Sequence, residues 1–135
     1  MVLASKKLEV GYELPNFVKR AKLTPPPGGF PWGSPHNEAF AKSIGFKGAL
    51  VPGVITSAYM SEWLTGFFGQ NWFKHGKLDV KFVGGGVVDK EMLTGKGAVR
   101  EKVAEDSGVR LTLEVWFENE EGKKVVVGTA TCLVT

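Results

Sequence analysis

Hydrophobic and polar side chains alternate over much of the second half of the chain. The run from Leu78 to Phe82 alternates apolar with charged residues, and residues 109–118 do the same over a longer stretch. A period of two is typical of strands with one buried face. Strands are also predicted over 93–105 and 123–134. Turn-forming residues separate these strands, at 84–86, 106–108 and 119–122.

The last predicted strand is apolar on both of its faces. Val127 and Leu133 lie on one face, whereas Val126, Ala130 and Cys132 lie on the other. A strand of this kind is expected to be covered on both sides. We therefore expect a helix on one face of the sheet and a second subunit on the other.

A different spacing of apolar residues precedes the strands and predicts one long helix. Pro52 suits the first turn of this helix, and Gly69 with Asn71 ends it. Apolar residues occupy more than half of the helix circumference, so the helix is expected to be wrapped by other elements. Those residues are Val54, Ile55, Ala58, Tyr59, Trp63, Leu64, Phe67 and Phe68.

The first third of the chain carries weaker signals. Two short extended segments are predicted at 8–14 and 17–23, and a short helix at 36–43, closed by Gly45. Between them, residues 24–33 hold four prolines and three glycines, which exclude a regular helix or a central strand. This loop is either a spacer or, through Phe30 and Trp32, one wall of a site.

Composition limits the class of protein. With 135 residues, of which 43% are hydrophobic and 23% charged, residues 1–135 are expected to form a single domain. The 17 basic residues are scattered, which disfavours nucleic-acid binding. One cysteine, Cys132, excludes an intramolecular disulfide and a multi-cysteine zinc site. No apolar run is long enough for a membrane span, so a cytoplasmic location is expected.

The segment around His36 holds the candidate chemistry. An imidazole exchanges a proton near neutral pH, and the first N–H groups of a helix lack internal partners and carry the positive end of its dipole. His36 and the start of the long helix at Gly53 therefore suggest a proton-transfer group beside an anion-stabilising site. No Asp or Glu lies between Glu13 and Glu38, and no metal-ligand spacing is present.

The chain resembles the MaoC-like dehydratases and (R)-specific enoyl-CoA hydratases over most of its length. The resemblance implies an α+β hotdog fold, an antiparallel sheet wrapped around a long central helix. It also implies reversible hydration of a 2-enoyl thioester of coenzyme A or an acyl carrier, by a homodimer without a metal or other cofactor. Its matching segments are Val10–Pro15, Ser34–His36, Phe40–Ala41, Gly45–Phe46, Val51–Gly53 and the strands from Leu78 onward.

The resemblance also assigns roles to residues. His36 corresponds to the histidine of the acid/base dyad, and Gly53 to the glycine whose backbone N–H polarises the thioester carbonyl. Trp32, Ser34 and Pro52 are then expected to contact the substrate. The dyad aspartate is not matched, because its position falls on Trp32 or Pro31, neither of which transfers protons.

Two other functions remain open from the sequence. Hotdog thioesterases place a carboxylate on the central helix, and Glu62 occupies such a place nine residues after Gly53. Glu38 is a second candidate carboxylate, the nearest to His36 along the chain. The missing aspartate also suits a subunit that binds acyl thioesters without turning them over.

Overall fold

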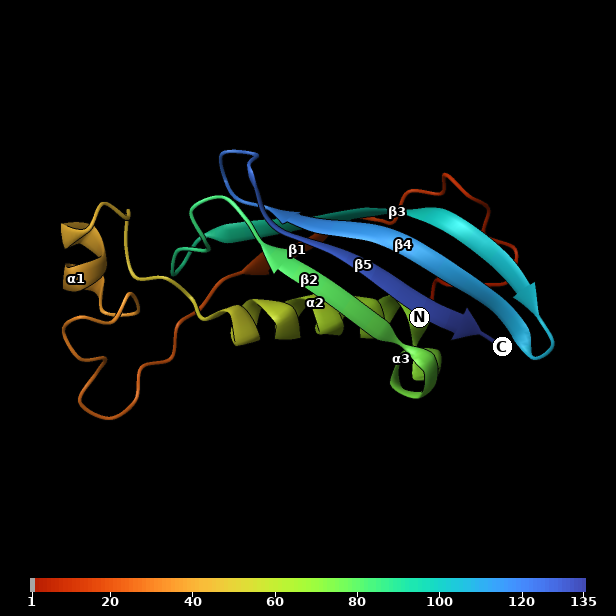
Figure 1. Cartoon of the computed structure of the whole chain (residues 1–135), viewed down its shortest axis with the longest axis horizontal. Helices are drawn as coiled ribbons and strands as arrows, with labels where there is room; N and C mark the ends of the chain where they lie inside the picture. Colours follow the sequence, from red (N-terminus) through yellow and green to blue (C-terminus); the bar gives the residue numbers. More distant parts are fainter. Residues whose placement is uncertain (1) are drawn as a thin grey trace.

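The computed structural model describes residues 2–135, which form one sheet and three helices (Figure 1). Strand β1 spans Phe17–Arg20 and is followed by the helices. The helices are α1 (Glu38–Ser43), α2 (Gly53–Phe68) and α3 (Gln70–His75). The remaining strands are β2 (Lys77–Phe82), β3 (Met92–Glu105), β4 (Gly108–Glu118) and β5 (Lys124–Val134).

The five strands form one antiparallel sheet in the order β1-β3-β4-β5-β2. The four strands predicted after the long helix are thus confirmed. The segment predicted at 8–14 is not a strand, because a turn at Gly11, with a φ of 97°, leaves only a bridge between Glu13 and Ala98. Of the segment predicted at 17–23, only Phe17–Arg20 forms a strand, β1. Its last residue, Arg20, pairs with Met92, the first residue of β3.

Helix α2 lies on the concave face of the sheet (Figure 1). Its buried residues recur every three or four positions and so form one stripe: Thr56, Met60, Trp63, Leu64, Phe67 and Phe68. Trp63 stacks on Phe17 and Phe117, with ring centroids 5.9 and 6.0 Å apart, and thereby joins α2 to β1 and β4. Fully burying a large apolar side chain contributes about 1.5–3 kcal/mol, so this stripe is a main source of stability.

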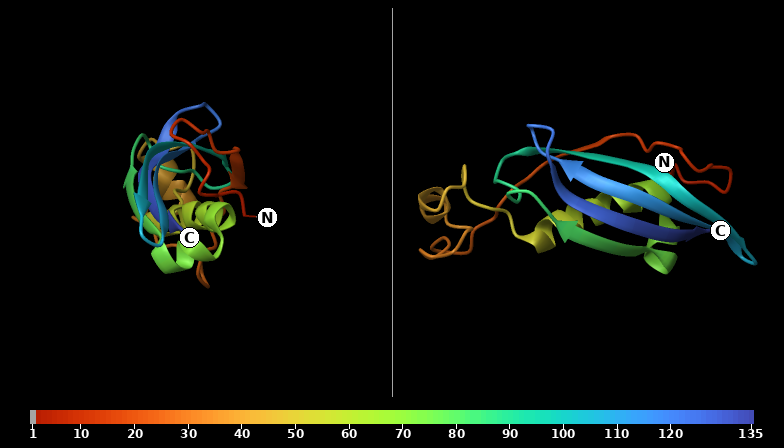
Figure 2. Two further views of the ribbon diagram at one scale, coloured as in Figure 1. Left: turned by 90° about the vertical axis from the view of Figure 1, so that its right-hand side faces the viewer. Right: turned by 45° about the horizontal axis from the view of Figure 1, so that its top comes forward.

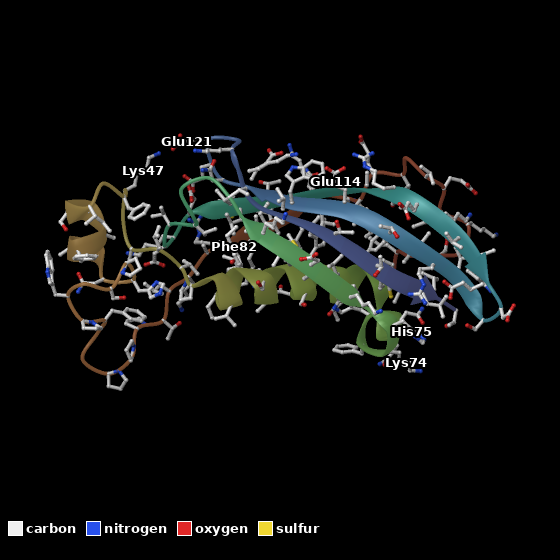
Figure 3. The ribbon with its side chains drawn as sticks, in the orientation of Figure 1. Lys47, Lys74, His75, Phe82, Glu114 and Glu121 are labelled. Atoms are coloured by element: carbon white, nitrogen blue, oxygen red, sulfur yellow. The ribbon has the colours of Figure 1, made fainter. Side chains whose placement is uncertain are left out.

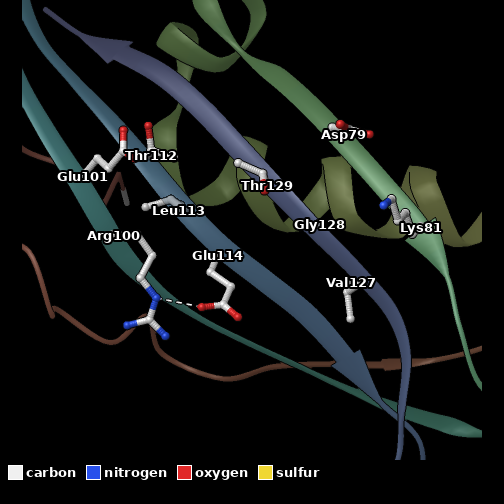
Figure 4. A pocket seen from close by; sticks show the side chains of 10 residues that line it. All are labelled: Asp79, Lys81, Arg100, Glu101, Thr112, Leu113, Glu114, Val127, Gly128 and Thr129. Atoms are coloured by element: carbon white, nitrogen blue, oxygen red, sulfur yellow. Dashed lines mark hydrogen bonds and ion pairs between the residues drawn. The ribbon is translucent and has the colours of Figure 1, made fainter.

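The sheet packs against one side of α2 and leaves the other side exposed. Val54 is 75% exposed, and Ala58, Glu62 and Gly66 face solvent on the same side. The convex face of the sheet is also uncovered, and it is more polar than expected. Arg100, on that face, pairs with Glu114 at 2.7 Å beside a pocket lined by residues of four strands (Figure 4).

Residues 24–50 form an arm that extends beyond the sheet and α2 (Figure 2). Its helix α1 begins later than predicted, since Asn37 accepts a hydrogen bond from the N–H of Phe40 at 2.9 Å and caps the helix. Several contacts join the arm and the following residue, Val51, to the body, among them the hydrogen bond from the N–H of Asp89 to the carbonyl of Ala49 at 2.8 Å. Val51 N–H donates to the carbonyl of Val87 at 2.8 Å, and Lys47 forms an ion pair with Glu121 in the β4–β5 turn (Figure 3).

The long helix ends at Gly69 as predicted, but the chain then forms the unpredicted helix α3. Gly69 has a φ of 65° and caps both helices, so one residue separates them. His75 is the last residue of α3. Among the residues described, no helix is both long and apolar enough to cross a membrane.

Candidate functional site

His36 lies in the arm, two residues before the first turn of α1. It is half-buried, and its Nδ1 is 2.7 Å from the carbonyl oxygen of Leu50. The ring of Phe30 lies against it, with centroids 5.4 Å apart. The backbone N–H of His36 donates to Ser34 Oγ at 3.2 Å, which holds the turn before the histidine. The imidazole is therefore fixed by contacts on two sides.

The contact with Leu50 also fixes the tautomer of His36. A carbonyl oxygen only accepts hydrogen bonds, so Nδ1 must carry the proton and donate it. In the neutral ring, Nε2 is then the unprotonated nitrogen. The hydrogen bond thus leaves Nε2 as the atom that can accept a proton from a reactant.

Pro52 and Gly53 form the start of α2. Pro52 is the N-cap residue and supplies no side-chain hydrogen bond to the helix. Among the hydrogen bonds of residues 2–135, none has the N–H of Gly53 as donor, whereas the N–H of Ile55 donates to the carbonyl of Pro52 at 3.0 Å. The free N–H of Gly53 lies at the positive end of a 16-residue helix, where a developing negative charge is stabilised.

Leu50 links His36 to this helix start. Gly53 follows Leu50 by three residues, and three residues span at most about 11 Å. The imidazole is therefore tied to the segment that leads into α2. That His36 and Gly53 act on the same substrate remains a prediction.

Trp32 lies on the surface of the arm. It is 67% exposed and packs edge-on against Phe40, with ring centroids 5.1 Å apart. Of the two loop aromatics considered in the sequence, Phe30 is the one in contact with His36. Contact of Trp32, Ser34 or Pro52 with a substrate remains a prediction.

No carboxylate takes the place of the unmatched aspartate in the contacts of residues 2–135. The hydrogen bonds and ion pairs found there place no Asp or Glu on the His36 ring. Glu38, the nearest along the chain, is exposed and pairs with Lys42 at 3.5 Å, one turn further along α1. Glu38 therefore pairs within its own helix, and its negative charge in the first turn stabilises the N-terminus of α1.

Glu62 lies on the exposed side of α2, where its carboxylate pairs with Lys19 of β1. Its Oε1 is 2.8 Å from Lys19 Nζ, and this hydrogen bond raises the pKa of Lys19. Nine residues of helix separate Glu62 from Gly53, or about 13.5 Å along the axis. The carboxylate borders an apolar groove of about 310 Å³ between α2 and β1, which includes Phe17, Trp63 and Gly66.

We expect the Glu62→Gln variant to retain any acyl-thioester turnover that the wild-type protein shows. The reason is that the Glu62 carboxylate is bound to Lys19 and lies roughly 13.5 Å along α2 from Gly53. Thiol release from short and aromatic acyl-CoAs, followed for both proteins, checks this. Loss of thiol release in the variant alone would instead make Glu62 the catalytic carboxylate of a thioesterase.

Two residues near His36 and Gly53 escape sequence reasoning. Leu50 acts through its backbone carbonyl, which every residue type carries. Phe82 reads as an ordinary apolar position of a strand, yet its ring lies against Gly53. Only the packing of β2 beside the start of α2 identifies it (Figure 3).

Comparison with known proteins defines the class at the level of the fold. No known protein family matches the sequence, and no curated protein matches it. Solved structures do match. The (R)-hydratase from A. caviae involved in PHA biosynthesis shares 18% identity, with a TM-score of 0.69 over 97% of this chain and 100% of the other.

Two further structures agree with that match. The MaoC-like dehydratase from Rhodospirillum rubrum shares 15% identity, with a TM-score of 0.68 over 96% of this chain and 94% of the other. A chain of the ChsH1-ChsH2 complex from Mycobacterium tuberculosis shares 16% identity, with a TM-score of 0.67 over 94% and 98%. The protein therefore has the α+β hotdog fold. Within that fold, the MaoC-like dehydratases and (R)-hydratases are its structural neighbours, as the sequence resemblance predicts.

Proposed function

We propose that this protein is a hydratase or dehydratase of the MaoC-like kind, which adds water reversibly to a 2-enoyl thioester of coenzyme A or an acyl carrier. One observation carries the proposal. The hydrogen bond from Nδ1 of His36 to the carbonyl of Leu50 leaves Nε2 as a free base, and Leu50 lies three residues before Gly53, whose N–H is unpaired. A base beside an oxyanion donor is the arrangement that such an addition needs.

In the proposed reaction His36 moves one proton. Nε2 accepts a proton from water while the water oxygen bonds to C3 of the enoyl group. The electrons of the double bond move toward the thioester oxygen, where the N–H of Gly53 stabilises the negative charge. The imidazolium then returns a proton to C2, which completes the addition of one water. These steps use only groups of the chain, so we propose that no cofactor takes part.

The unmatched aspartate makes the reaction depend on one proton-transfer group. In a dyad, two side chains share the acid and base steps, and each contributes about 100-fold to 10,000-fold in rate. His36 alone must therefore act first as base and then as acid. For this reason we expect hydration to be slower than with a complete dyad. We expect the rate to depend on His36 as strongly as it would in a dyad.

Hydration of crotonyl-CoA by the purified protein tests the proposal. We expect conversion to 3-hydroxybutyryl-CoA without release of free thiol, with product identified by mass. Thiol release instead of hydration would favour hydrolysis. A rise in melting temperature with crotonyl-CoA but no product would show a binding subunit, since a ligand of the native state stabilises it by mass action.

We propose a second copy of this chain as the partner, paired through β2. This strand ends the sheet, and an edge strand offers a row of free N–H and C=O groups. An antiparallel pair of β2 strands centred on Val80 places Asp79 of each copy opposite Lys81 of the other. The same register places Leu78 opposite Phe82. Opposite charges then meet on one face and apolar side chains on the other.

The Asp79→Lys variant is expected to weaken such a dimer at least about fourfold. Two opposite-charge pairs are replaced by two like-charge pairs, each worth about 0.2–1 kcal/mol. Adding Lys81→Asp restores opposite charges and should restore the dimer. Sedimentation of the three proteins over a range of concentrations measures the effect. A dimer that is unaffected by Asp79→Lys would rule out this register.

The proposed setting is the cytoplasm. Cys132 is unpaired and buried, and burial raises its pKa to about 11, so the thiol stays neutral at physiological pH. A lone buried thiol of this kind suits a reducing compartment.

A further inference from the structure

The ring of Phe82 lies directly against the backbone of Gly53. A Cβ atom built on Gly53 would be 2.8 Å from Cζ and 2.9 Å from Cε2 of Phe82. The end of the ring therefore touches the residue whose N–H is proposed to bind the thioester oxygen. Phe82 is nevertheless 51% exposed, so much of its ring faces open space beside the helix start (Figure 3).

The backbone that carries Phe82 is held at both ends. Phe82 pairs with Val126 of β5, and the next residue, Val83, donates its N–H to Val125 at 3.0 Å. The chain then turns through residues 84–86 and returns to Val87, whose carbonyl accepts the N–H of Val51 at 2.8 Å. The ring of Phe82 is thus a half-exposed group on a backbone held by hydrogen bonds.

The segment from Phe82 to Val87 borders both parts of the proposed site, the Gly53 N–H and the Leu50 carbonyl that holds His36. Phe82 contacts Gly53, and a Cβ built on Gly86 would lie 3.6 Å from the side chain of Leu50, whose carbonyl holds His36. A thioester carbonyl bound at Gly53 has its acyl carbons within a few ångströms of that N–H. The acyl carbons and the Phe82 ring must therefore share the space at the start of α2.

We infer that Phe82 determines which acyl groups the site accepts, by limiting their length. This inference rests on the proposed function. A short, flat enoyl group packs against the exposed face of the ring, and its contact removes apolar surface from water. A longer chain meets the ring and must displace it. The side chain acts on the acyl group directly, and its removal opens the space beside Gly53.

Relative rates on a short and a long substrate test this inference. We expect Phe82→Ala to raise the ratio of kcat/KM for 2-octenoyl-CoA over crotonyl-CoA at least about tenfold, because one methylene in an apolar pocket is worth about 10-fold to 200-fold. Phe82→Leu should raise the ratio less. The control is Phe73→Ala, on α3, where the phenylalanine is 73% exposed; its ratio should equal that of the wild type.

The outcomes separate this inference from the proposed function. If Phe82 only packs the sheet, Phe82→Ala lowers the melting temperature and changes both rates equally, which overturns the inference and leaves the function intact. If the wild-type protein binds both thioesters but turns over neither, the hydratase proposal fails. In that case the binding constants of the two thioesters are measured by calorimetry for the wild type and for Phe82→Ala. A ratio that shifts toward the longer thioester in Phe82→Ala supports the role of Phe82 in limiting acyl length. An unchanged ratio, or no binding of either thioester, overturns the inference.

Discussion

Replacing His36 by alanine is expected to lower kcat/KM for hydration of crotonyl-CoA by about 100-fold to 10,000-fold, the usual contribution of a positioned acid/base group. The loss should lie near the upper end, because no carboxylate contacts the His36 ring in residues 2–135 to take over the proton. The chain offers a matched control in His75, its other histidine, at the end of α3. His75→Ala should hydrate at the wild-type rate.

The His36→Ala result is read on a variant whose fold matches that of the wild type by circular dichroism. A correctly folded His36→Ala protein that hydrates crotonyl-CoA at the wild-type rate would remove His36 from the mechanism.

Gly53→Ala is expected to lower kcat by about 100-fold to 1,000-fold, as much as the loss of one oxyanion donor, because the new methyl group keeps the thioester oxygen away from the N–H that alanine retains. The new methyl group would sit 2.8 Å from the ring of Phe82 and in the path of the thioester oxygen. Because the half-exposed ring can turn aside, we expect a loss of only about 1–3 kcal/mol in the free energy of unfolding. Rate and denaturant unfolding, measured on the same protein, separate the two effects.

Gly66→Ala is the matched control on the same helix. A Cβ at Gly66 meets nothing within 4 Å. Alanine there should stabilise the protein by about 0.4–1 kcal/mol and leave kcat unchanged. In the Gly53→Ala/Phe82→Ala double variant, the clash with the ring is gone, so the two stability losses should not add. A Gly53→Ala protein with the wild-type kcat would show that the carbonyl binds elsewhere.

Much of the fold follows from local pattern. The alternation in 78–82 and 109–118 predicts strands that the structure confirms as β2 and β4. Such strands are predictable because each residue's environment depends on a period of two along the chain. Residues 8–14 show the limit. Their apolar content suggests a strand, but the turn at Gly11 and the position of β3 decide how many of them pair.

The site was predictable in part. His36 and Gly53 stand out because an imidazole can transfer protons and a helix-starting glycine leaves its N–H accessible, and the family resemblance assigns them roles that remain predictions. Glu62 was a reasonable rival from helix position alone. Its pairing with Lys19, 43 residues away in the chain, came only from the packing of β1 beside α2.

By itself, the sequence determined the class of fold, the strand and helix segments that build it, and the histidine and glycine that carry the candidate chemistry. These features depend on the spacing of residue types along the chain. The tertiary structure alone decided the proton-bearing nitrogen of His36, through the carbonyl of Leu50, and the place of Phe82 over Gly53. Both are contacts between residues 14 or more positions apart, and no local pattern records which of many distant groups will meet.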